Sequence, residues 1–123
     1  MKIRESEEMY LETILLLKNR IHFVRSIDIA EELGYSRPSV SRAVGLLSKK
    51  EYIQIGKNGE IALTSEGERR AMEIYERHEL ITDFLMELGA DVEMAEDNAC
   101  RIEHVISKEL FELLKKRKNE RQK

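Results

Sequence analysis

The chain has 123 residues, enough for one compact unit or two small subdomains. No apolar run reaches the ~20 residues that cross a bilayer, and the N-terminus lacks the apolar core of a signal peptide, so we expect a cytoplasmic protein with no membrane partner. The single cysteine excludes an internal disulfide, and the net charge of -3 gives no sign by itself of a nucleic-acid partner.

Charge is unevenly distributed along the chain. Residues 1–66 contain ten Lys or Arg and ten Asp or Glu, whereas residues 67–114 contain five basic and thirteen acidic residues. The segment 115–123 has six basic residues and one acidic residue. We therefore predict two domains, 1–66 and 67–123, with different partners.

Apolar periodicity predicts a chain that is mostly helical. The predicted elements are helices over 7–20, 26–34 and 37–51, a hairpin over 52–64, and helices over 65–88, 92–106 and 108–118. Gly34 and Gly89 are helix stop signals, and Asn58-Gly59 is a strong hairpin-turn signal. Two short helices around a glycine-containing turn, followed by a hairpin, are typical of a winged helix-turn-helix. We expect this motif at the N-terminus of a mainly α fold, followed by a helical second domain.

The helix over 37–51 is the predicted DNA-reading helix. Residues near the N-terminus of such a helix reach base edges, while Lys and Arg neutralise phosphates. The alternative is an ordinary helical pair with a solvated polar face, but the Ala30/Gly34 spacing, the Ser/Arg-rich helix and the wing together favour DNA binding. The predicted DNA-binding residues are Arg37, Ser39, Ser41, Arg42, Lys49 and Lys57. Base and phosphate contacts both stay open for Arg37, Ser39, Ser41 and Arg42, and Lys57 at the wing tip could approach a phosphate or the minor groove. A solvated helix end is the expectation for Lys49 and Lys50.

Three potential metal ligands lie close together in the segment ACRIEHV. Residues at i, i+3 and i+4 share a helical face, so Cys100, Glu103 and His104 should project together. A thiolate, a carboxylate and an imidazole are ligands that transition metals take. A core cysteine beside a surface Glu-His pair is the ordinary alternative. Glu96 one turn upstream and His78 on the preceding long helix favour a metal site.

A catalytic site receives less support. The segment HELIT begins like the HExxH motif of zinc proteases, but Thr82 stands where the second histidine would be. Cys100 and His104 could imitate a nucleophile and its base, yet a helix interior is a poor place for a nucleophile. We therefore expect that the protein is not an enzyme. A metallohydrolase is the least supported of the functions that the sequence suggests.

Five segments, in the right order over roughly residues 5 to 114, resemble the DtxR/MntR family of metal-dependent transcriptional repressors. The segments are EEMYLETI (7–14), SIDIAEELGYSRPSVSRAVGLLSKKEYI (26–53), LTSEG (63–67), ERHELITDFL (76–85) and DNACRIEHVIS (97–107). The resemblance implies a homodimer of winged-helix subunits with a helical dimerisation and metal-binding domain. It also implies that Fe(II) or Mn(II) activates the protein to bind double-stranded operator DNA in front of metal-uptake genes.

The resemblance also implies the metal ligands. The primary site would be formed by Met9, Cys100, Glu103 and His104. A second site would use Glu12 and His78, with Glu103 able to bridge the two. From its period alone, Met9 is an apolar helix position, and only the resemblance makes it a thioether ligand.

The chain mixes features of two branches of this family. Met9 and Cys100 match the iron-responsive branch, whereas Glu12 matches the manganese-responsive branch. Thr82 and Glu96 stand where the iron branch has a Glu and a His, and Glu96 could still be a carboxylate ligand. We also expect that the protein lacks the C-terminal SH3-like domain of the iron branch, as the manganese branch does. Because sulfur ligands favour softer ions, we expect Fe(II) first and Mn(II) next, while Zn(II), Co(II) or Ni(II) could bind in vitro.

The main alternative is a winged-helix regulator whose effector is not a metal. It keeps the reading helix and makes Cys100 a core residue. Operator binding that a chelator does not change would favour this alternative.

Overall fold

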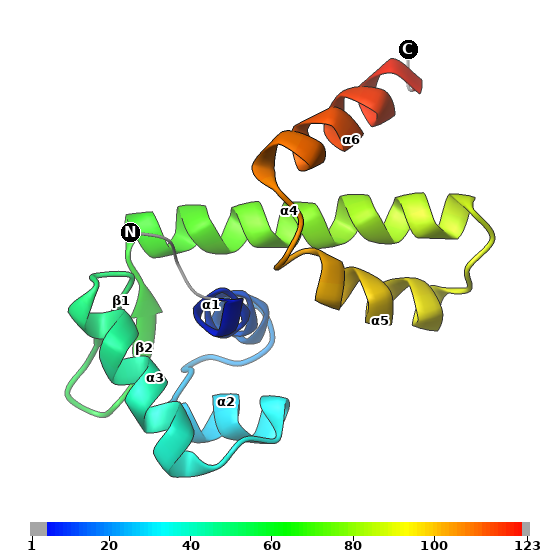
Figure 1. Ribbon diagram of the computed structural model, residues 1–123. Coiled ribbons are helices and arrows are strands. Elements are labelled where there is room, and N and C mark those ends of the chain that lie inside the picture. Colours follow the sequence, from blue (N-terminus) through cyan, green and yellow to red (C-terminus); the bar gives the residue numbers. More distant parts are fainter. Residues whose placement is uncertain (1–4, 122–123) are drawn as a thin grey trace. The chain divides into compact units, whose positions relative to one another are not determined.

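The computed structural model describes residues 5–121, which form six helices and one two-stranded antiparallel sheet (Figure 1). The elements are α1 (Glu5–Lys18), α2 (Ser26–Leu33), α3 (Arg37–Lys49), β1 (Ile53–Ile55), β2 (Ile61–Leu63), α4 (Ser65–Glu87), α5 (Val92–Ile102) and α6 (Lys108–Arg121). The predicted mainly α fold with a winged helix-turn-helix is confirmed, and residues 5–121 contain no SH3-like barrel.

The chain divides into two compact units, Met1–Met72 and Glu73–Lys123, and the division falls within α4. The first unit holds α1, α2, α3 and the sheet, and the second holds the greater part of α4 with α5 and α6. Within residues 5–121, no helix combines the length and the apolar composition needed to cross a membrane.

Local signals set the ends of α2 and α3. Gly34 follows α2 with a φ of 71°, a left-handed conformation that glycine adopts without strain, and its N–H bonds to the carbonyl of Ala30. Ser36 caps α3, because its side chain accepts a hydrogen bond from the backbone N–H of Ser39 at 3.3 Å. Pro38 lies in the first turn of α3, where its missing N–H has no helical partner to lose. The two helices therefore begin and end close to the predicted positions.

A single apolar core orients the reading helix α3. Its largest fully buried side chains, each no more than 1% exposed, are Leu11, Ile14, Ile29, Val40, Leu47 and Ile53. Burial of side chains of this size contributes about 1.5–3 kcal/mol each. Because α1 packs against both α2 and α3, it is the helix that fixes the helix-turn-helix in place.

The hairpin forms a short wing beside this core. β1 and β2 pair antiparallel, with Ile55 opposite Ile61, and Gly59 in the connecting loop has a φ of 80°. Val24 forms an isolated bridge with Ile61, and Arg25 donates from Nε to the carbonyl of Asn58 at 3.1 Å. The segment before α2 therefore anchors both the strand and the tip of the wing.

An ion pair joins α1 to the end of α3. Lys50, the residue after α3, places its Nζ 2.8 and 3.1 Å from the two carboxylate oxygens of Glu7. The Glu7 side chain is 7% exposed and the Lys50 side chain is 25% exposed. The expectation that Lys50 belongs to a solvated helix end is therefore wrong, whereas Lys49 is exposed as expected.

The second unit is built around α4. α5 runs back along α4 after the chain reverses at Gly89, whose φ is 112° (Figure 1). Asp91 caps α5 by accepting a hydrogen bond from the N–H of Met94 at 2.8 Å. α6 is held to α4 by ion pairs and a cation–π contact. These contacts are Lys115 to Glu76 at 2.7 Å, Lys118 to Asp83 at 2.9 Å, and Arg77 over the ring of Phe111.

The helix predicted over 92–106 ends earlier, at Ile102. Glu103 is its C-cap residue, and Val105 and Ile106 both bond to the carbonyl of Ile102 in a tight turn. Ser107 then caps α6 by accepting from the N–H of Leu110 at 3.1 Å. The prediction extended the helix too far because helical periodicity does not reveal a turn that is held by side-chain contacts elsewhere in the fold.

Replacing Lys50 with Met should lower the free energy of unfolding by about 1–3 kcal/mol, because the buried Glu7 carboxylate loses its partner while the aliphatic stem is kept. Urea unfolding followed by circular dichroism would measure the loss. Lys49→Met is the matched control, and it should change stability by less than about 0.5 kcal/mol. Equal effects of the two substitutions would contradict a structural role for the Glu7–Lys50 pair.

Candidate metal centre

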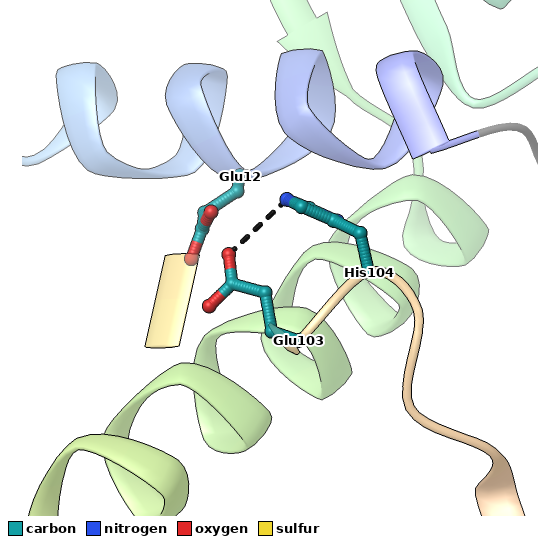
Figure 2. Close-up of side chains that lie close together, drawn as sticks. All are labelled: Glu12, Glu103 and His104. Carbon is teal, nitrogen blue, oxygen red and sulfur yellow. Dashed lines mark ion pairs between the residues drawn. The ribbon is translucent and has the colours of Figure 1, made fainter. Parts of the chain in front are cut away.

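A completely buried carboxylate lies between two histidines in the second unit. Glu103 is 0% exposed. His78 on α4 places Nδ1 2.7 Å from Glu103 Oε2, a hydrogen-bond distance in which the ring nitrogen donates. His104 places Nε2 3.2 Å from Glu103 Oε1, and Figure 2 shows this ion pair. Two imidazoles from different elements therefore converge on one carboxylate.

The end of α5 positions this carboxylate. The backbone N–H of Glu103 bonds to the carbonyl of Ala99 at 2.9 Å, so its side chain leaves from the last turn of the helix. Arg77, the neighbour of His78 on α4, donates from Nη1 to the carbonyl of Glu103 at 3.4 Å. These two contacts fix the backbone of Glu103, whereas the burial cost of its carboxylate is offset by the rings of His78 and His104.

Thr82 adds a polar atom to the same part of α4. It lies one helical turn after His78, so both side chains are on one face of the helix. Thr82 is 9% exposed, and among the described residues its Oγ1 has no hydrogen-bond partner. Buried polar atoms almost always have a partner, so the unpartnered Thr82 hydroxyl is notable. This buried face of α4 therefore presents a hydroxyl oxygen from Thr82 as well as a ring nitrogen from His78.

These donors fit a divalent transition metal. Imidazole nitrogen suits Fe(II), Co(II), Ni(II) and Zn(II), and carboxylate oxygen suits Mn(II), so His78, Glu103 and His104 form a set that several such ions accept. The hydrogen bond from His78 Nδ1 also fixes the orientation of the Glu103 carboxylate, as contacts around metal ligands commonly do. The site therefore has the chemistry of a metal centre.

Two other predicted ligands lie on the exposed side of α5. Cys100 and Glu96 are both exposed, whereas Glu103 is buried. The expected common helical face of Cys100, Glu103 and His104 is not a regular one, because α5 ends at Ile102 and His104 lies in the following turn. Sequence spacing therefore grouped Cys100, Glu103 and His104, although these residues differ in burial.

The remaining predicted ligands, Met9 and Glu12, belong to the first unit and lie one turn apart on α1. Glu12 is 8% exposed, an unusual degree of burial for a carboxylate. Met9 Sδ is 3.7 Å from the hydroxyl of Tyr35, a residue that the spacing of ligand types did not single out. The burial of Glu12 identifies it as a candidate ligand even without the family resemblance. The apolar periodicity of α1 did not predict this burial.

The predicted DNA-binding residues lie on α3 and on the wing. All of them are exposed except Ser39, which is half-buried and accepts a hydrogen bond from the Ser36 hydroxyl at 2.9 Å. Within residues 5–121, the four basic residues of this set have no ion-pair partner; they are Arg37, Arg42, Lys49 and Lys57. Their charges are therefore available to an anionic partner.

Two family models together match almost the whole chain. Residues 2–60 match the model described as iron dependent repressor, N-terminal DNA binding domain, and residues 64–123 match iron dependent repressor, metal binding and dimerisation domain. The chain belongs to the iron-dependent repressor family. The five-segment resemblance to metal-dependent repressors is thereby confirmed.

Curated relatives and solved structures of the family agree with this assignment. The chain is 35% identical over 109 residues to transcriptional regulator MntR of Salmonella typhimurium, covering 89% of this chain and 69% of the relative. It is 32% identical over 107 residues to diphtheria toxin repressor of Corynebacterium glutamicum, covering 86% and 47%. The structure of the manganese regulator SloR has a TM-score of 0.81 and 31% identity, and the match covers 97% of this chain. The chain spans about half the length of that structure, of which the match covers 55%.

These repressor relatives also bear on the question of catalysis. MntR is named as a transcriptional regulator and the Corynebacterium glutamicum relative as a repressor, and neither is named as an enzyme. The comparisons therefore agree with the expectation that this chain is not an enzyme.

In the metal-free protein, His78→Ala should lower the free energy of unfolding by about 1–3 kcal/mol, because it removes a hydrogen bond to a completely buried carboxylate. Urea unfolding in the presence of a chelator would measure this cost. His22→Ala is the control, since His22 is exposed in a loop. Identical stabilities of the two variants would show that the His78–Glu103 contact does not support the fold.

Proposed function

We propose that this chain is a metal-dependent transcriptional repressor of metal-uptake genes, which binds double-stranded operator DNA as a homodimer. The observation that carries the proposal is the buried Glu103 carboxylate between His78 and His104, in the same chain as a winged helix-turn-helix. The unpaired cationic side chains of α3 and the wing supply the surface for DNA phosphates.

The proposed ligands come from both units. His78, Glu103 and His104 supply nitrogen and oxygen donors, and their convergence supports this role. Met9 and Cys100 would add the sulfur donors that the family resemblance implies. Glu12 and Glu96 would add carboxylates, either to the same ion or to a second one.

Shared coordination would link metal binding to DNA binding. Ligands on α1 and ligands on α4 and α5, once joined by one ion, would restrict the placement of one unit on the other. In a two-fold dimer, that placement sets the spacing of the two α3 helices, which must match half-sites one or more helical turns apart. A divalent ion also supplies positive charge that offsets the clustered carboxylates of the acidic segment.

Apolar side chains of the second unit support the proposed dimer. The exposed set around the turn from α4 to α5 consists of Met86, Leu88, Val92 and Met94, each between 41% and 73% exposed. Such a cluster favours burial against another surface. The family model that covers residues 64–123 is described as a dimerisation domain, so a second copy of this chain is the partner that we propose.

The donor set bears on the identity of the metal. Met9 and Cys100 carry sulfur, which favours Fe(II) over Mn(II), whereas Glu12 adds an oxygen donor that suits Mn(II). The family model is described as iron dependent, and SloR is named as a manganese regulator. We propose Fe(II) as the preferred ion and Mn(II) as the next.

Operator affinity should rise by at least about tenfold when Fe(II) or Mn(II) is added anaerobically, and a chelator should reverse the increase. Fluorescence anisotropy with a duplex selected from a random pool by the Mn(II)-treated protein would measure it.

Glu103→Gln should abolish the metal response. Arg42→Ala should weaken DNA binding and leave metal affinity unchanged. Tight operator binding that neither chelator nor Glu103→Gln alters would instead favour a non-metal effector.

The double substitution Met9→Asp and Cys100→Glu should shift the preference from Fe(II) toward Mn(II), because it replaces both sulfur donors with oxygen donors. Competitive metal titrations would give the Fe(II)/Mn(II) affinity ratio, which should fall by about tenfold or more. Met72→Asp with Gln54→Glu is the control, because both positions are exposed and belong neither to the proposed ligands nor to the proposed dimer surface. An unchanged ratio in the double variant would rule out sulfur coordination as the source of metal selectivity.

A further inference from the structure

The turn of the helix-turn-helix touches a proposed metal ligand. Tyr35 lies in this turn, between Gly34, which ends α2, and Ser36, which caps α3. Its hydroxyl donates to Met9 Sδ on α1 at 3.7 Å, a distance typical of a weak hydrogen bond to sulfur. The contact joins residues that are 26 positions apart within the first unit.

Other contacts hold Tyr35 in this position. Its backbone N–H bonds to the carbonyl of Ala30 at 3.2 Å, and its ring packs against Tyr10 with the ring centroids 6.2 Å apart. Tyr10 is 5% exposed, and burial, with a smaller contribution from Tyr35, raises the pKa of Tyr10 above its ordinary value. Tyr10 is therefore a neutral packing partner, and the Tyr35 hydroxyl is directed by the backbone turn and by this ring.

α1 is thus attached near both ends of the reading helix. Tyr35 connects Met9 to the residue that caps the start of α3, and the Glu7–Lys50 ion pair connects α1 to its end. The pair at the far end is partly buried and has two short contacts, so it is the stronger of the two attachments. A change at Met9 would therefore be felt mainly at the start of α3, where base-reading residues lie.

We infer that Tyr35 is a positioning residue that restrains Met9 in the metal-free chain and thereby opposes metal binding. The inference rests on the proposed function, in which Met9 Sδ is a metal ligand. A metal ion draws electron density from a thioether, so the sulfur that coordinates it becomes a poorer hydrogen-bond acceptor. The Tyr35 hydroxyl would therefore compete with a bound metal for Sδ, and loss of the hydrogen bond would free the turn before α3.

The competition predicts the direction of a coupled effect. An interaction that is stronger in the metal-free state lowers metal affinity, and through linkage it raises the metal concentration needed for operator binding. Because a neutral hydrogen bond to sulfur is weak, its removal should change this concentration by about two- to fivefold.

Tyr35→Phe should therefore lower, by about two- to fivefold, the Mn(II) concentration that gives half-maximal operator binding, with operator affinity at saturating Mn(II) unchanged. Tyr52→Phe, a hydroxyl deletion elsewhere in the first unit, is the matched control and should cause no shift. In the Met9→Leu background, Tyr35→Phe should have no further effect, because the sulfur acceptor is gone.

A second readout does not depend on DNA. In the metal-free protein labelled with 13C at its methionine methyl groups, Tyr35→Phe should move the Met9 resonance and leave those of Met86 and Met94 in place. Addition of Zn(II), a diamagnetic probe, to the wild-type protein should also move the Met9 resonance.

Three results would overturn the role of Tyr35: an unchanged Mn(II) requirement, an equal shift in the Met9→Leu background, or weaker operator binding at saturating Mn(II). The last result would make Tyr35 a DNA contact instead. Wild-type operator binding that ignores every metal would overturn the proposed function, and the metal-free methyl spectra would then still decide whether Tyr35 restrains Met9.

Discussion

The buried carboxylate of Glu103 is the constraint around which the second unit is organised. A carboxylate without solvent contact needs partners, and the rings of His78 and His104 supply them from two segments, while Arg77 donates to the backbone carbonyl of Glu103. To place Glu103 there, α5 must end at Ile102, and the following turn must carry His104 inward. A buried cluster of one carboxylate and two imidazoles would destabilise an ordinary apolar core. The cluster is therefore consistent with the proposed binding of a cation.

α1 has the corresponding role in the first unit. Its apolar face forms the core with α2 and α3, while its other residues include the ion-pair partner of Lys50 and two proposed metal ligands. Because α1 both packs against α3 and carries proposed metal ligands, a change in metal coordination could alter the position of α3. No movement inside the core would be needed. Close packing favours such a transfer, since well-packed interiors deform little.

Much of the fold was predictable because its signals are local. Gly34, Ser36 and the alternating hairpin depend only on neighbouring residues, and the helix-turn-helix was found within two residues of its observed limits. The end of α5 was missed, because Glu103 is held by His78 from a different helix. Lys50 was misassigned for the same reason, since its partner Glu7 lies 43 residues away.

The candidate site was only partly predictable. Ligand chemistry and spacing found Glu103, His104 and His78, which the structure brings together, but they also grouped the exposed Cys100 with the buried pair. Met9 and Glu12 came from the family resemblance, because an apolar period gives no reason to treat a methionine or a single glutamate as a ligand. Burial is the physical property that separates Glu12 from ordinary surface carboxylates, and it emerges only in the folded chain.

The anchoring of the wing has a consequence for the thermodynamics of recognition. Strands of three residues and a five-residue loop would normally lose much conformational entropy on reaching a ligand, but Arg25 already restrains the carbonyl of Asn58 and Val24 already pairs with Ile61. Most of that entropy is therefore lost during folding. The wing can then meet a duplex as a preorganised element, at a smaller entropic penalty than a mobile loop would incur.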